Sequence, residues 1–150
     1  MKLKKIIFIG FFAFCATTLN AQQKTHAFFM IGNYAYSEWE KLEFDLNDNG
    51  GEITYSYAKK PDGIKLKILG IKYIGQYKVL MVKIPGFAKT YYINPDPKNE
   101  RIQFESSDRK YNKWLPLGYE GPVNGIGTYC EPCANEPEEA FDIVNSFMGN

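Results

Sequence analysis

The sequence predicts a mainly β protein: a small antiparallel barrel or sandwich of about seven to nine strands, followed by one C-terminal α-helix. Three observations support this class. Apolar and polar residues alternate with a period of two in several short segments between residues 27 and 117. Turn signals rich in Gly, Pro and Asn separate these segments at spacings of about ten residues. Helical periodicity is confined to residues 135–148, so the strand–helix alternation that builds a parallel sheet is missing.

The expected strands follow one another along the chain, and most end at a turn signal. Residues 42–46 and 53–57 both alternate, and the turn sequence Asn47–Gly51 between them predicts a hairpin. A further strand is expected over Ile64–Ile68, after a turn at Lys60–Gly63. The other expected strands cover residues 27–36, 77–84, 90–93, 101–105 and 114–117.

The C-terminal helix is expected at about residues 135–148. Asn135 is a suitable N-cap residue, and the acidic residues just after it favour the positive end of a helix. Gly149 is a suitable stop. The apolar residues recur at spacings of three and four and form one stripe, which must pack on the sheet: Ala140, Phe141, Val144, Phe147 and Met148.

The N-terminal residues 1–21 have the layout of a secretory signal peptide. Three lysines precede an apolar run from Ile6 to Ala16, and the expected cleavage follows Ala21. The run is shorter than the roughly 18 residues that span a bilayer. The expected mature chain, residues 22–150, is a single β domain that is secreted or periplasmic and has no transmembrane segment.

Charge is unevenly distributed in the expected mature chain. Residues 22–113 hold 15 basic and 11 acidic side chains, whereas residues 114–150 hold six acidic and no basic ones. A nucleic-acid-binding protein needs a strongly basic surface, so no nucleic-acid partner is expected. The single histidine, His26, excludes any mechanism that requires two imidazoles.

The sequence Cys130-Glu131-Pro132-Cys133 precedes the expected helix. In an oxidising compartment the two cysteines are expected to form a disulfide that clips the helix start. The motif also resembles the redox centre of the thioredoxin family, which implies a thiol–disulfide oxidoreductase as an alternative function. However, only 17 residues follow Cys133, and the surrounding acidic side chains disfavour a thiolate.

The segment from Asp45 to Gly50 resembles the first half of an EF-hand calcium loop, with oxygen-bearing residues at alternate positions and a glycine for the sharp turn. This resemblance implies Asp45, Asn47 and Asn49 as calcium ligands. The twelfth position is Ser56 rather than glutamate, and the flanking segments are expected strands. A hairpin turn explains the same residues more simply, so no cofactor is expected, and calcium remains the one alternative that the sequence suggests.

Two surface patterns are candidates for recognition. Tyr91, Tyr92 and Trp114 are predicted as exposed ligand-binding aromatics, because a large ring with a polar edge suits recognition. Lysines also recur in the central strands, where they form either a basic binding face or an ordinary solvated face. These lysines are Lys65, Lys67, Lys72, Lys78 and Lys83.

The expected function is a secreted or periplasmic, non-enzymatic binding module for a small apolar ligand or a protein partner. Gly32-Asn33-Tyr34 is similar to the G-x-W motif of lipocalins, which implies a ligand inside a barrel. Besides the oxidoreductase, the second alternative is a hydrolase that uses paired carboxylates. The acidic pairs on one strand face are Glu38 with Glu40 and Glu43 with Asp45.

Overall fold

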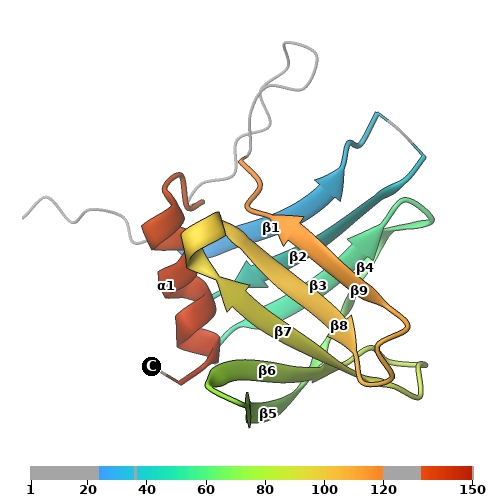
Figure 1. The fold of residues 1–150 in the computed structure, drawn as a ribbon. Helices are drawn as coiled ribbons and strands as arrows, with labels where there is room; N and C mark the ends of the chain where they lie inside the picture. Colours follow the sequence, from blue (N-terminus) through green and yellow to red (C-terminus); the bar gives the residue numbers. More distant parts are fainter. Residues whose placement is uncertain (1–23, 36, 120–132, 150) are drawn as a thin grey trace, which may run out of the picture.

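The computed structural model describes residues 24–35, 37–119 and 133–149, in which nine antiparallel strands form two sheets (Figure 1). The four-stranded sheet follows chain order: β1 (His26–Gly32), β2 (Trp39–Asp45), β3 (Glu52–Tyr57) and β4 (Lys60–Lys65). The five-stranded sheet also follows chain order: β5 (Lys67–Ile74), β6 (Tyr77–Lys83), β7 (Thr90–Asp96), β8 (Arg101–Ser106) and β9 (Asn112–Pro116). The predicted mainly β class is confirmed, and the sheets are arranged like a sandwich rather than closed into a barrel.

The two sheets are joined by the backbone at both sides. Leu66 is the single residue between β4 and β5, and its N–H donates to the Ile53 carbonyl at 2.8 Å. On the other side, Phe29 of β1 forms an isolated bridge with Leu117, just beyond β9. The Gly118 N–H donates to the Phe28 carbonyl at 2.9 Å. These contacts hold the two inner faces opposite one another.

Large side chains fill the space between the sheets. Phe29 and Phe44 of the first sheet and Phe104 of the second are completely buried. The Tyr55 and Phe104 rings, one from each sheet, lie 5.4 Å apart between centroids. Because burial of apolar area is the main favourable contribution to folding, this aromatic contact zone is central to the stability of the sandwich.

The helix α1 (Pro137–Phe147) covers one end of the sandwich, where β1 begins and β2 ends (Figure 1). Phe141 packs on Phe29 at 5.4 Å, and Phe147 packs on Phe44 at 5.6 Å between ring centroids. An ion pair of 2.8 Å also joins Lys24 to Glu139. The predicted helix and its apolar face are confirmed. No helix in the described ranges is both long enough and apolar enough to cross a bilayer.

The expectation that Asn135 caps this helix is wrong. Glu136 is the N-cap residue, Pro137 is the first helical residue, and no side chain caps the N-terminus. The Asn135 backbone N–H instead donates to the carboxylate of Glu139 at 3.2 Å. Proline favours the first helical position because it has no N–H to leave unpaired there, so Pro137 begins the helix and the N-cap lies one residue later than expected.

Several strand boundaries differ from expectation. The strand expected over Ile64–Ile68 is divided between the two sheets, because β4 ends at Lys65 and β5 begins at Lys67. The first strand ends at Gly32 instead of continuing to residue 36. The expected turn at Lys60–Gly63 lies inside β4, which is an edge strand and therefore tolerates Pro61. Finally, β7 passes Ile93 and ends at Asp96, before the 3-10 helix η1 (Pro97–Asn99).

Candidate functional site

The outer face of the five-stranded sheet carries a groove of about 400 Å³. Its rim and floor come from β5 to β9, and we call it the aromatic groove. Its lining residues include Tyr77, Tyr92, Asn94, Gln103, Glu105 and Trp114. These side chains are brought together by the strand register, because Tyr92 lies opposite Glu105 and Gln103 lies opposite both Asn94 and Trp114.

The groove opens where β6 and β7 stop pairing. Their ladder runs from Lys83 opposite Thr90 to Leu80 opposite Ile93, and it ends there. Pro95 follows two residues later and has no N–H to donate to a neighbouring strand. Because β7 remains paired with β8 up to Asp96, β6 diverges alone and leaves the groove between them.

Two of the groove's aromatic rings interact with cations. The Lys72 ammonium lies 5.7 Å from the centroid of the Tyr92 ring, and the Arg101 guanidinium lies 4.0 Å from that of Trp114. Cations at these distances are attracted to the electron-rich face of an aromatic ring. The groove therefore combines apolar ring surface with positive charge at its edges.

Side-chain amides form a row across three strands of the groove floor. The Asn94 amide donates to the Gln103 oxygen at 3.4 Å, and the Gln103 amide donates to Asn112 at 3.0 Å. At the end of the groove, the Asn99 amide and then Arg101 donate to the Asp96 carboxylate, and both lower the pKa of that group. This floor offers hydrogen-bond donors and acceptors beside the rings.

The three aromatic residues predicted to be exposed differ in burial: Trp114 is exposed, Tyr92 is half-buried and Tyr91 is buried. Tyr92 and Trp114 both line the aromatic groove. Tyr91 is only 7% exposed and stacks on Phe104 at 5.1 Å, so its predicted exposure is wrong. Adjacent residues of a strand point to opposite faces, which puts Tyr91 in the core and Tyr92 on the surface.

Other groove residues were missed by the sequence analysis: Tyr77, Asn94 and Gln103. The alternating pattern of residues 92, 94 and 96, and of 101, 103 and 105, assigns each set to one face of its strand. That pattern does not say which residues of different strands are neighbours. Only the register of β7 with β8 and the divergence of β6 bring them into one groove.

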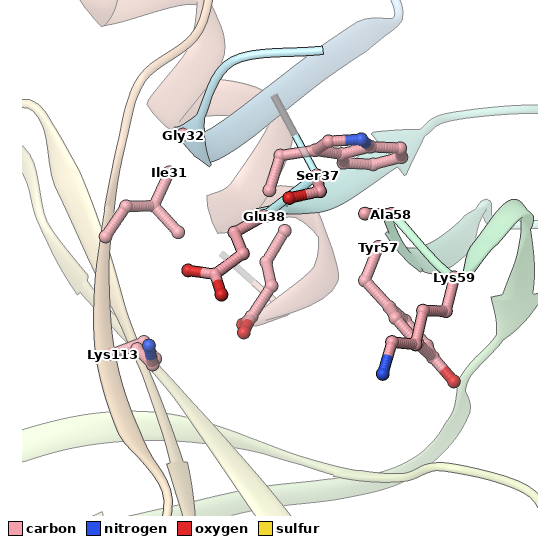
Figure 2. A pocket seen from close by; sticks show the side chains of 10 residues that line it. Ile31, Gly32, Ser37, Glu38, Tyr57, Ala58, Lys59 and Lys113 are labelled. Atoms are coloured by element: carbon pink, nitrogen blue, oxygen red, sulfur yellow. The ribbon is translucent and has the colours of Figure 1, made fainter. Parts of the chain in front are cut away.

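A second pocket, of about 420 Å³, lies at the end of the sandwich opposite α1 (Figure 2). It is formed where β1 ends, β2 begins and β3 turns into β4. In Figure 2 the Glu38 carboxylate lies in the middle of this end pocket, between Ile31 and Lys113 on one side and Tyr57 and Lys59 on the other. The pocket thus contains carboxylates and ammonium groups together.

Glu38 and Glu40, one of the acidic pairs considered for a hydrolase, both line the end pocket. The Tyr111 hydroxyl donates a hydrogen bond to the Glu40 carboxylate. Burial and then this contact raise the pKa of Tyr111, and burial and the Glu40 charge raise that of Tyr55. Both phenols therefore remain protonated around neutral pH, and Glu40 is held as the acceptor of a bond between the two sheets.

The side chains considered for calcium binding form a hairpin turn. The Asn47 side-chain oxygen accepts the backbone N–H groups of Asn49 at 2.9 Å and Gly51 at 3.1 Å. Such bonds define an Asx turn and explain the sequence without an ion. The Asp45 carboxylate lies 2.5 Å from Nδ1 of His26. Within the described ranges, no three His, Cys, Asp or Glu side chains are grouped as a metal site.

The predicted cysteine pair is only partly described. Cys133 is buried and its backbone forms a parallel bridge with His26, while the Ala134 N–H donates to the His26 carbonyl at 2.8 Å. The segment before α1 therefore runs beside the start of β1. Cys130 and the expected signal peptide lie outside the described residues, so the disulfide and the cleavage remain predictions.

The fold and the groove define a class of molecule: an antiparallel β-sandwich closed at one end by a helix, with an aromatic groove on its outer face. Comparisons of the chain with protein-family models, curated proteins and solved structures each find no match.

Proposed function

We propose that this protein is a non-enzymatic binding module that holds its ligand in the aromatic groove. The observation that carries this proposal is the gathering of Tyr77, Tyr92 and Trp114 around a floor of paired amides. Aromatic rings provide rigid contact area, and a few fixed polar groups orient a ligand. The groove has both, and Lys72 adds a cation at its edge, while Asp96 and Glu105 add carboxylates to its lining.

The packing of the interior favours a ligand on the surface over a ligand between the sheets. Phe29, Phe44 and Phe104 occupy the space that a lipocalin-like carrier would need for its cargo. The ligand that best fits the groove is amphipathic, with an apolar ring system for the aromatic residues and an anionic or hydrogen-bonding group within reach of Lys72. This ligand differs from the small apolar ligand expected from the sequence, because it also carries an anionic or hydrogen-bonding group.

The proposed site of action is the periplasm or the outside of the cell. Lys2, Lys4 and Lys5 followed by the apolar run 6–16 support export, and cleavage after Ala21 would release the chain that contains every described strand.

The groove is tested with an amphipathic dye, 1-anilinonaphthalene-8-sulfonate, whose fluorescence rises on apolar binding. We expect Trp114→Ala to weaken dye binding about tenfold, because the lost ring contact is worth about 1.4 kcal/mol. Backbone chemical-shift changes in NMR spectra should centre on Tyr92, Asn94 and Gln103 as the dye is added.

The matched control is Phe87→Ala, which removes an exposed aromatic ring outside the groove and should leave dye affinity unchanged. Equal affinities for the Trp114→Ala variant and the unaltered protein, or shift changes centred on the end pocket, would contradict the proposed function.

The oxidoreductase alternative is separated by the redox chemistry of Cys130 and Cys133. A structural clip should have a reduction potential below about −300 mV and should not accelerate the reduction of insulin by a thiol. Equilibration with defined thiol–disulfide buffers measures the potential. A value in the range of about −120 to −270 mV, together with insulin reductase activity, would instead favour the enzyme.

A further inference from the structure

The hairpin of β5 and β6, residues 67–83, exposes a cluster of apolar side chains. It holds six of the eleven large hydrophobic residues that are exposed in the described part of the chain: Ile68, Leu69, Ile71, Tyr73, Ile74 and Tyr77. Tyr73 and Tyr77 have the largest exposed fractions of the six, 68% and 57%. Clusters of this kind on a folded protein mark a surface that another phase or molecule covers.

The apolar cluster runs along the edge strand β5 from Ile68 to the hairpin tip at Ile74 and Tyr77, and it involves both faces of the strand. Strand alternation directs Ile71 and Tyr73 to one face of β5 and Ile74 to the other. Two features leave the tip uncovered: β5 is an edge strand, and β6 pairs with β7 only over residues 80–83. A flat partner surface could cover only one face of such a protrusion. A medium that surrounds the protrusion covers both apolar faces.

The same hairpin is strongly basic. It carries Lys67, Lys72, Lys78 and Lys83, and the sequence has no acidic residue between Asp62 and Asp96. Lys67 lies directly opposite Lys83 in the ladder, an arrangement that costs stability through like-charge repulsion. Among the described residues, no carboxylate forms an ion pair with Lys67 or Lys83.

We propose that this hairpin docks the protein onto the surface of an anionic lipid bilayer. The apolar tip enters the headgroup region, where tyrosine is favoured because its ring is apolar and its hydroxyl is polar. The lysines reach the lipid phosphates while their methylene chains stay against the apolar region. This surface adjoins the proposed ligand site, because Ile74 and Tyr77 also line the aromatic groove. Ile71, Tyr73 and Lys67 lie outside the groove lining, so variants at these positions test docking apart from ligand binding.

Charge favours a bilayer over a second copy of this chain. A β5–β5 contact between two copies would gather eight lysines from the two hairpins without an acidic residue from either. The register of β5 also shifts between Ile68 and Gly70, and such a bulge interrupts the regular edge that an added strand would need. An anionic bilayer removes the charge repulsion and covers the apolar tip at once.

The test is vesicle co-sedimentation of the chain from residue 22 onward, which contains every described element but lacks the apolar run 6–16. Vesicles are phosphatidylcholine alone or phosphatidylcholine with about 30% phosphatidylglycerol, for which basic residues near the surface give added affinity. We expect at least tenfold tighter binding to the anionic vesicles, decreasing as salt is raised because salt screens the attraction.

Two variants separate the apolar and the charged contributions. Ile71→Ser combined with Tyr73→Ser should reduce binding to anionic vesicles at least tenfold, because two buried apolar side chains are lost. Lys67→Glu should reduce it at least fivefold, and its circular dichroism spectrum checks that the sheet is retained. The controls Phe87→Ser and Lys110→Glu change exposed residues outside the hairpin and should bind like the unaltered chain.

Three results would overturn the docking proposal. One is equal or absent binding to both kinds of vesicle. Another is anionic-vesicle binding that the hairpin variants leave unchanged. The third is a dimer in analytical ultracentrifugation that Ile71→Ser with Tyr73→Ser dissociates, since this would assign the hairpin to a second copy. The effect of Trp114→Ala on dye binding tests only the ligand site in the aromatic groove. Failure of the docking proposal can therefore be distinguished from failure of the proposed function.

Discussion

Replacement of the buried phenylalanine between the sheets (Phe104→Ala) is expected to destabilise the fold by about 3–5 kcal/mol. Phe104 is completely buried and touches Tyr55, Tyr91 and Tyr111, with ring centroids 5.1 to 5.6 Å away. These three rings belong to both sheets and to the turn before β9. Truncation would leave a cavity that such rigid neighbours cannot fill, so the cost includes lost contacts as well as lost burial.

Urea unfolding followed by circular dichroism measures this loss as a lower midpoint. Phe87→Ala is the matched control, because Phe87 is 47% exposed and its loss should change the free energy of unfolding by less than about 0.5 kcal/mol. A loss of less than about 1 kcal/mol for Phe104→Ala would mean that the sheets do not pack through this ring.

The second large effect is expected at the end of β1. Gly32→Ala should cost about 3 kcal/mol, because backbone strain and a steric clash act together. Gly32 has φ of 86°, a conformation that residues with a Cβ rarely adopt. An added Cβ would also lie 2.3 Å from the Glu38 carbonyl oxygen, so the backbone at the start of β2 would have to move.

Gly75→Ala is the matched control for Gly32→Ala. Gly75 also has a positive φ, of 61°, but its added Cβ would meet no atom within 4 Å. The Gly75→Ala variant should lose only the stability that the unfavourable backbone conformation costs, about 1–2 kcal/mol. Thermal unfolding of both variants gives the comparison, and equal losses would remove the steric explanation. The glycine of the Gly32-Asn33-Tyr34 motif is thus accounted for by local backbone geometry.

Several elements follow from local sequence alone. The hairpin of β2 and β3 was predicted because alternation in both strands and the Asn47–Gly51 turn are encoded within about fifteen residues. The helix α1 was predicted for the same reason, since its apolar stripe and the acidic residues of its first turn are neighbours in the chain. Errors arose where a boundary depends on a distant partner, as at β4, whose edge position allows Pro61 within a strand.

In the candidate site, too, some features follow from local sequence and others depend on distant segments. The sequence singled out Tyr92 and Trp114 by residue type, but it assigned the same role to Tyr91, which faces the core. Which of two adjacent tyrosines is buried depends on the face that the other sheet covers, and no residue near Tyr91 in the chain specifies it.

Residue order and side-chain chemistry were enough to predict a chain of strands with one terminal helix, because alternation, turns and caps act between near neighbours. The aromatic groove and the apolar hairpin were decided by tertiary structure. Strand register aligned Asn94, Gln103 and Trp114, and the early end of β6–β7 pairing exposed the hairpin tip. Both depend on hydrogen bonds between distant segments, which become defined only when the whole sheet has formed.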